Sequence, residues 1–302
     1  MNKQLRGSLL LLLTAAIWGA AFVAQSESMS YIGPFTMQAT RFLLAGLVLL
    51  PVIAFCDKKG ITMYRPVTAA QKKAQWKAGL ICGTILFIAS TFQQVGLIHT
   101  SVGKSGFITA LYITIVPLLG VFLKKKVSLR LWFCALLALV GLYILCVREN
   151  LRINLGDWLT LICALFFSFH ICYIDSVSNK VDCIRLSCTQ FFVCSVLSAA
   201  GMLLTETPSW DAVRACWLPI VYAGVCSGGI AYTLQIIGQK TVQPTLASLL
   251  MSLESVFAAL FGWLLIGQKL SSTELLGCCI MFAAIVLAQL PEKTRSRRPS
   301  VN

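Results

Sequence analysis

The chain has 302 residues, of which 58% are hydrophobic and 12% are charged, about half the charged share of an average soluble domain. A core of this size cannot hide so much apolar surface from water, so the composition excludes an ordinary soluble domain and indicates that the solvent is lipid. The formal net charge of +14 would also suit a nucleic-acid-binding protein, and the positions of the charges decide between the two interpretations.

Apolar runs with almost no charge recur along the whole chain. Each run is long enough to cross roughly 30 Å of hydrocarbon as a helix. Two runs contain one charged residue each, Arg41 in the second run and Glu254 in the ninth. The sequence therefore predicts an all-α polytopic membrane protein with ten transmembrane helices, at residues 7–26, 35–56, 78–98, 105–123, 131–147, 158–174, 186–205, 215–239, 244–266 and 275–291.

The first run follows Lys3 and Arg6, and so it also resembles the beginning of a cleaved signal peptide. We interpret it as a membrane span, because a similar run begins the second half of the chain. The longest connection, residues 57–75, is polar and could hold one surface helix. The other connections are mostly short, which leaves no room for a second soluble domain.

The basic residues are distributed unevenly between the two sides of the predicted membrane. With the N-terminus in the cytoplasm, 19 Lys and Arg residues lie inside and five lie outside, and Arg41 completes the 25. This positive-inside pattern places both termini in the cytoplasm, including a basic tail at 291–302. The net charge is thus a signal of orientation against anionic lipid headgroups, and nucleic-acid binding has no further support.

The sequence contains no recognisable pattern for a metal or a nucleotide. Its 13 cysteines are scattered through the apolar runs without paired ligand spacing, and there are only two histidines. We interpret the cysteines as small buried hydrophobic residues. The G-x-x-x-x-G-K spacing of a phosphate-binding loop is absent. We therefore expect no metal site, no cofactor and no ATPase activity.

The two halves of the chain resemble each other when one is shifted onto the other. Five matched spans follow in the same order in each half. Because five is odd, the second half would enter the membrane from the opposite side. We therefore predict an inverted repeat, with one five-helix unit at 7–147, the other at 156–290, and a substrate site near the midplane between them. The matched pairs include Gly7 with Gly156, Arg41 with Gln190, Gln94 with Gln235, and Tyr112 with Glu254.

Several segments carry a resemblance to a known family. They read AAIWGAAF in the first span, ATRFLLAG in the second, ITALYITIVPLLG followed by KKKVSLRLW, and ASLLMSLESVFAALFGWLLIGQKLS followed by LLGCCIMFAAIVLAQL. Over residues 7–290 the chain resembles the EamA family of the drug/metabolite transporter superfamily. It departs from the family pattern at Ser255, where proline is common, and at Gln268, where glutamate is common. The resemblance implies a ten-helix fold and carriage of small metabolites, often export of amino acids or related compounds.

Two charged residues lie within predicted spans, where charge is costly. Glu254 is near mid-depth, where it could bind a substrate amine or take up a proton during transport. Arg41 could hold a substrate carboxylate through two parallel hydrogen bonds. For both residues the alternative is structural, namely a hydrogen bond or an ion pair that joins neighbouring helices.

Other polar and aromatic side chains at mid-depth could line the same site. Trp18 precedes a glycine that allows close helix approach, and His170, with Tyr173 on the same helix face, could relay a proton. Amides and hydroxyls at this depth also come from Gln93 and its neighbours, and interhelical packing or hydrogen bonding is the alternative for each residue. The predicted substrate-binding set is Glu254, Arg41, Trp18, Tyr112, Gln94, Tyr232, Gln235 and His170.

Together these patterns predict a secondary transporter that moves a small metabolite, an amino acid or related compound, across the plasma membrane by alternating access, with export as the expected direction. Proton coupling through Glu254 and uncoupled movement are both open, and so is a homodimer. The alternatives are a broad-specificity drug exporter, a membrane-embedded flippase or enzyme acting on lipid intermediates, and a non-transporting scaffold. An enzyme is disfavoured because the sequence has no H-E-x-x-H, no pair of intramembrane aspartates and no Ser/His/acid set.

Overall fold

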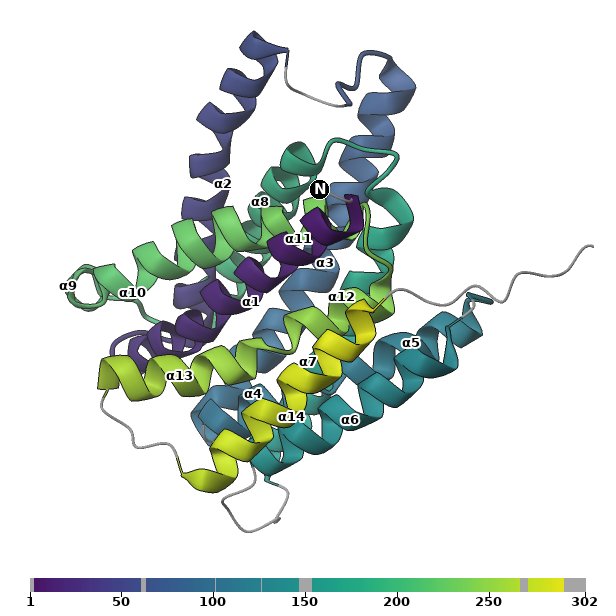
Figure 1. Cartoon of the computed structure of the whole chain (residues 1–302). Helices are drawn as coiled ribbons and strands as arrows, with labels where there is room; N and C mark the ends of the chain where they lie inside the picture. Colours follow the sequence, from purple (N-terminus) through teal and green to yellow (C-terminus); the bar gives the residue numbers. More distant parts are fainter. Residues whose placement is uncertain are drawn as a thin grey trace, which may run out of the picture.

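The computed structural model describes residues 3–60, 64–100, 102–125, 127–146, 154–266 and 271–290. Within these ranges the chain forms helices joined by turns, without a β-strand (Figure 1). Nine helical stretches are long and apolar enough to cross a membrane, and the shorter apolar helix Leu129–Ile144 provides a tenth span. The protein is thus a multi-pass membrane protein, and the predicted all-α fold is confirmed.

The first five spans are α1 (Lys3–Ser28), α2 (Pro34–Lys59), α3 (Ala69–His99), α4 with α5 (Val102–Thr109 and Tyr112–Phe122) and α6 (Leu129–Cys146). The second five are α7 (Leu155–Val177), α8 (Cys183–Thr205), the run α10, η1 and α11 (Trp217–Val221, Tyr222–Tyr232 and Thr233–Gln239), α12 with α13 (Pro244–Met251 and Glu254–Ile266) and α14 (Ser272–Gln289). The short α9 (Trp210–Ala215) lies in the connection between α8 and α10.

Capping residues fix where several helices begin. Thr68, Asn154 and Ser271 each accept a hydrogen bond from the backbone amide three residues on, and the side chain at that position bonds back to the capping residue's amide. These capping boxes satisfy amides that no helical carbonyl reaches. The box at Thr68 begins α3 at Ala69. The surface helix predicted within 57–75 is therefore the first part of the third span and not a separate helix.

The most extensive helix–helix contacts join the two halves of the chain. Helix α2 packs along α8, and α6 packs along α14, so the second and fifth spans of one half each meet their equivalents in the other. Helix α3 packs against α7 and α8, and the equivalent run α10, η1 and α11 packs against α1 and α2. Every one of these contacts has a counterpart obtained by exchanging the halves. The predicted two-repeat architecture, with a pseudo-two-fold relation, is therefore present in the packing.

Two equivalent glycine contacts show the same relation at atomic scale. A Cβ added to Gly7 would lie 2.9 Å from the carbonyl oxygen of Gly238, and a Cβ added to Gly156 would lie 2.7 Å from the carbonyl oxygen of Gly96. Gly7 and Gly156 are the pair that the sequence repeat matches. At both places the helices approach so closely that a side chain larger than hydrogen would force them apart.

The fourth and ninth spans are both interrupted near their middle. Ala110 and Leu111 separate α4 from α5, and Ser252 and Leu253 separate α12 from α13. The backbone tightens there, because the amide of Ile113 bonds to the Ala110 carbonyl at 3.0 Å and the amide of Leu253 bonds to the carbonyl three residues back at 3.3 Å. Short tightened turns within a helix often act as hinges. The two interruptions occupy equivalent positions in the repeats. Neither contains a proline or glycine that would predict a break in the helix.

Candidate functional site

A small cavity lies between the two halves, at the depth of the interrupted spans. Its volume is about 30 Å³, which leaves room for only a few water molecules. Helices from both repeats contribute to its wall, so neither half forms it alone. The lining residues are Trp18, Phe22, Gln25, Arg41, Gln93, Thr109, Tyr112, Phe167, Ile171, Ser227, Tyr232, Gln235, Met251 and Glu254.

Glu254 and Tyr112 meet in this cavity. Glu254 is the first residue of α13 and Tyr112 is the first residue of α5, so each follows one of the two interruptions. The Tyr112 hydroxyl donates a hydrogen bond of 2.9 Å to Oε1 of Glu254. The Glu254 side chain is almost fully buried, with 4% of its surface exposed. Burial disfavours the charged form of this side chain, and the hydrogen bond from Tyr112 offsets part of that cost.

Arg41 supplies a buried positive charge to the wall. Its Nη1 donates a hydrogen bond of 2.5 Å to Oε1 of Gln25, and its Cζ lies 4.6 Å from the centre of the Phe42 ring. Its Nε has no hydrogen-bond partner among the residues that the structure describes. Among the described side chains none forms an ion pair with Arg41. A guanidinium that is only 4% exposed and has an unused donor is suited to bind an anionic group that enters the cavity.

Trp18 and Tyr232 form an aromatic part of the wall. The centres of their rings are 4.7 Å apart, and the Trp18 Nε1 donates a hydrogen bond of 3.3 Å to the carbonyl oxygen of Ser227. Ser227 and Tyr232 both belong to η1, a π-helix within the eighth span. Such segments are rare in proteins, and those that do occur are frequently found at functional sites. Trp18 therefore links the first span to the eighth, whose backbone is a π-helix over Tyr222–Tyr232.

Two residues of the predicted set lie behind the cavity and do not line it. Nε2 of Gln94 donates a hydrogen bond of 3.4 Å to the backbone carbonyl of Gln25. Nε2 of His170 lies 3.1 Å from Oε1 of Gln190, and the His170 ring packs edge-on against Tyr232 at 6.1 Å. Both side chains support residues of the wall. The other six predicted residues, Glu254, Arg41, Trp18, Tyr112, Tyr232 and Gln235, are brought together around the cavity.

The predicted set does not include several residues that line the cavity. Gln93, whose polar group was noted from the sequence, lines it, whereas the neighbouring Gln94 does not. Gln25 falls near the end of the predicted first span, so its position in the sequence does not indicate a central site. Thr109 and Ser227 are small hydroxyl residues of a kind common in apolar helices. No local sequence signal distinguishes them from packing residues.

The two ends of the α2–α8 pair are held by equivalent contacts. At one end Glu206 accepts hydrogen bonds of 2.8 Å from the backbone amides of Phe35 and Thr36. At the other end Arg185 forms an ion pair of 2.5 Å with Asp57. The shift that matches the two repeats places Asp57 on Glu206 and Thr36 on Arg185. The two helices, which are equivalent in the repeats, are thus joined at both ends.

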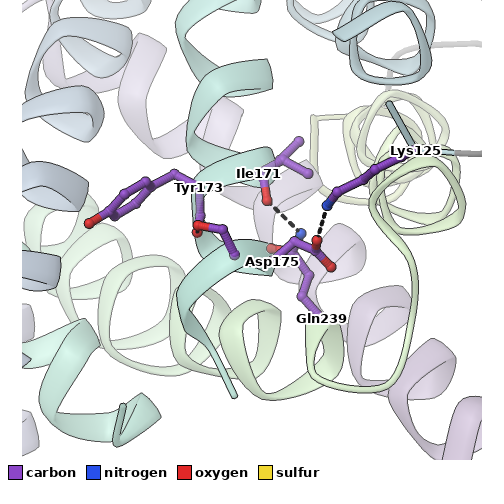
Figure 2. Close-up of polar contacts among 6 residues, drawn as sticks. Lys125, Ile171, Tyr173, Asp175 and Gln239 are labelled. Atoms are coloured by element: carbon purple, nitrogen blue, oxygen red, sulfur yellow. Dashed lines mark hydrogen bonds and ion pairs between the residues drawn. The ribbon is translucent and has the colours of Figure 1, made fainter. Parts of the chain in front are cut away.

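Figure 2 shows a further set of contacts at one end of α7. Lys125, which follows α5, forms an ion pair with Asp175 of α7, and Nε2 of Gln239 in α11 donates a hydrogen bond of 3.1 Å to the carbonyl oxygen of Ile171. Ile171 also lines the cavity. Tyr173, the predicted partner of His170, points away from this cluster. The contacts join the fourth, sixth and eighth spans.

The side chains of the site are suited to bind a ligand. It combines one buried carboxylate, one buried guanidinium, several amides and an aromatic wall. Within the described ranges, no group of three or more His, Cys, Asp or Glu side chains is placed to hold a metal ion. Oppositely charged groups in a buried cavity favour a ligand that carries both charges.

Comparison with known proteins relates both halves of the chain to one family. The model of the EamA-like transporter family matches residues 5–147 and again residues 154–290. An uncharacterized transporter of Archaeoglobus fulgidus is 30% identical over 294 residues, which are 95% of this chain and 87% of the relative. The uncharacterized inner membrane transporter YedA of Escherichia coli K12 is 25% identical, over 94% of this chain and 91% of the relative.

Two further matches extend the comparison. The WAT1-related protein At3g02690, chloroplastic, of Arabidopsis thaliana is 25% identical, over 91% of this chain and 67% of the relative. A solved crystal structure superimposes with a TM-score of 0.77 at 20% identity, and the match covers 94% of this chain and 96% of that one. At this identity the crystal structure establishes a shared fold.

Proposed function

The chain belongs to the EamA-like transporter family, and from this membership and the geometry of the central cavity we propose that it carries a small zwitterionic metabolite, an amino acid or related compound, across the plasma membrane by alternating access. That it is a membrane transporter rests on the family and on its relatives, which are named as transporters. The substrate, the direction and the mechanism are the proposal.

The observation that carries the proposal is the hydrogen bond between Tyr112 and Glu254. These residues hold equivalent positions in the two repeats, and two equivalent residues can touch only if both lie close to the pseudo-two-fold axis. In alternating access the two similar halves exchange conformations. Groups on the axis then move least, while contacts far from the axis form on one side of the membrane and break on the other side. The site can therefore stay in place while access to it alternates.

The charges of the cavity support a zwitterionic substrate. The carboxylate of such a molecule would bind the unused donor of Arg41, and its ammonium group would bind Glu254. Oε1 of Gln235 also has no hydrogen-bond partner in the wall. A ligand with both charges would neutralise both buried residues, whereas a singly charged ligand would leave one of them uncompensated. The cavity of about 30 Å³ must expand to admit it, and the hinges before Tyr112 and Glu254 provide the means.

Glu254 also offers a route for coupling transport to protons. A carboxyl group in a membrane interior can bind a proton when its ligand leaves and release the proton when a cationic group returns. Tyr112 donates to one of its oxygens, and no other side chain in the described ranges bonds to this carboxylate, which leaves the second oxygen for this exchange. Proton binding and amine binding would then compete at one residue.

The proposed orientation places both termini and the basic tail at 291–302 in the cytoplasm, on the excess of Lys and Arg there. Export is proposed from the family resemblance. A cysteine introduced at Ala70 should react with an impermeant maleimide only from the cytoplasmic side, and one at Asp211 in α9 only from outside. The opposite result would reverse the orientation and leave the cavity unchanged.

The aromatic part of the wall favours a second candidate, a broad-specificity drug exporter. The faces of Trp18 and Tyr232 could hold an apolar cation. Purified protein in proteoliposomes decides between the two: the proposal expects efflux of labelled amino acids, and the alternative expects efflux of tetraphenylphosphonium alone. Absence of efflux of either class at any pH, with intact protein in the vesicles, would sink both.

A further inference from the structure

A second and much larger cavity lies between α2, α3 and α8. Its volume is about 760 Å³, within the range of roughly 300–1,000 Å³ that small-molecule sites occupy. Figure 1 shows that α2 and α3 extend beyond the other helices at this end, where α2 finishes and α3 begins. The cavity is therefore a groove at the edge of the protein, and it is separate from the central site.

The inner part of the groove is apolar. Leu50 and Ile53 of α2 and Phe192 of α8 line it. Leu50 is 47% exposed, although it belongs to the apolar run that crosses the membrane. Trp76 of α3, which follows Lys72 by one helical turn, also lines the groove and is 67% exposed. Tryptophan is enriched at the boundary between headgroups and hydrocarbon. The apolar part of the groove is thus open to lipid chains.

The outer rim of the groove carries a surplus of positive charge. Three basic residues line the groove, and one of them, Arg185, forms an ion pair with Asp57. Arg65 and Lys72 also line the groove, and neither forms an ion pair with a described residue. The N-terminal end of α3 lies between them in the sequence, and its dipole adds a positive potential at the same place. The rim is therefore suited to bind an anion.

We propose that this groove binds an anionic phospholipid, with its phosphate between Arg65 and Lys72 and an acyl chain along Leu50, Ile53 and Phe192. The groove combines an apolar channel with a basic end. The channel is complementary to an acyl chain, and the basic end is complementary to an anionic headgroup. Basic pockets between transmembrane helices are a recognised form of anionic lipid site.

The charge of the rim argues against the other occupants. The chain's own tail at 291–302 carries four basic residues and one acid, so the rim would repel it. A second copy of the chain, joined through the same surface, would bring two basic rims together. A free phosphate would bind the rim without using the apolar channel, and a zwitterionic lipid would gain little from the surplus charge.

The test measures lipid binding to the purified full-length chain in detergent, by native mass spectrometry and by thermal shift. The probes are phosphatidylglycerol, phosphatidylcholine with the same acyl chains, and inorganic phosphate. We expect one phosphatidylglycerol to bind at least ten-fold more tightly than phosphatidylcholine. The double variant R65Q/K72Q should bind phosphatidylglycerol about thirty-fold more weakly, from the attraction of roughly two basic residues to an anionic headgroup.

Two variants make the test specific to the groove. K73Q/K77Q removes the same charge from exposed positions of α3 that do not line the groove, and its affinity should stay within about three-fold of the wild type. Ile53→Trp fills the apolar channel without changing the charge, and it should weaken the binding of both lipids. Because Arg65 and Lys72 are exposed, R65Q/K72Q should unfold at the wild-type temperature when no lipid is added.

The proposal is overturned if the two lipids bind equally well, or if K73Q/K77Q loses as much affinity as R65Q/K72Q, which would indicate a diffuse surface charge. It is also overturned if inorganic phosphate displaces phosphatidylglycerol at equal concentration, or if Ile53→Trp has no effect. In either case the apolar channel would not take part.

Discussion

Tyr112 and Glu254, which occupy equivalent positions in the two repeats, are joined by a hydrogen bond of 2.9 Å from the tyrosine hydroxyl to the carboxylate. Each is the first residue after an interruption in its span. The contact thus lies close to the pseudo-two-fold axis and next to both hinges. It also involves Glu254, the acidic residue in the lining of the central cavity. Changes at these two residues should therefore affect transport more than folding.

Glu254→Gln should lower the rate of transport by about ten-fold or more and flatten its dependence on pH. Glutamine still accepts the hydrogen bond from Tyr112, so the fold keeps this contact, but it can neither pair with an ammonium group nor bind a proton. Proteoliposome flux between pH 5.5 and 8.5 measures both effects. Tyr112→Phe is the matched control, because it removes the hydrogen bond and keeps the carboxylate, and its flux should remain pH-dependent. A Glu254→Gln protein that fails to fold would show that the residue serves packing.

Arg41→Gln should raise the KM for a zwitterionic substrate by roughly ten- to hundred-fold, because a hydrogen bond to a charged group contributes about 1.5–3 kcal/mol. The same substitution should change the KM for the corresponding amino-acid ester much less, since the ester lacks the carboxylate that Arg41 would bind. Initial rates of flux for the two compounds give the comparison. An equal rise in both KM values would assign Arg41 to helix packing.

Gly7→Ala and Gly156→Ala should each destabilise the protein by about 1–3 kcal/mol, because the new methyl group overpacks a helix contact. At both positions the added Cβ would lie under 3.0 Å from a backbone carbonyl oxygen of the facing helix. Gly120→Ala is the control, since its nearest contact would be 3.5 Å. Thermal unfolding in detergent measures the difference. Full stability of Gly7→Ala and Gly156→Ala would contradict the close packing of the two halves.

Asp175→Asn should shift the protein toward a state that is open on the side of Lys125 while leaving its stability nearly unchanged. The pair is partly exposed, with 41% of the Lys125 side chain and 23% of the Asp175 side chain accessible, and such pairs contribute little to stability. They can still bias two conformations of similar free energy. Maleimide labelling of a cysteine placed in the cavity wall, applied from each side of the membrane, measures the shift. The charge-swapped double variant Lys125→Asp with Asp175→Lys should restore the wild-type pattern.

The sequence predicted the spans well, because the length of an apolar run follows directly from the thickness of the bilayer. It could not predict which side of a span faces the cavity. Gln93 and Gln94 are neighbours in α3, and consecutive residues of a helix point roughly 100° apart, so one lines the cavity while the other contacts α1. Both faces of these helices are apolar, and the pattern of polar residues does not identify the inner face.

The repeat alignment placed Tyr112 and Glu254 at equivalent positions, but equivalence alone does not bring two residues together. They meet because both lie near the axis that relates the halves, and that axis is a property of the packed fold. The interruptions before them also depend on packing, since Ala110 and Ser252 carry no local signal for a break in the helix. His170 shows the opposite case: a polar residue at mid-depth that bonds to Gln190 behind the cavity wall.

Exchange of solute across proteoliposomes tests the central claim most directly. Vesicles that contain the wild-type protein and an unlabelled amino acid should take up the labelled amino acid against its gradient. The reason is that the protein changes its accessible side faster when its site holds a substrate than when the site is empty. Vesicles with Glu254→Ala should take up no more than protein-free vesicles. Uptake that is not stimulated by internal solute, or that survives Glu254→Ala unchanged, would contradict an alternating site built around this residue.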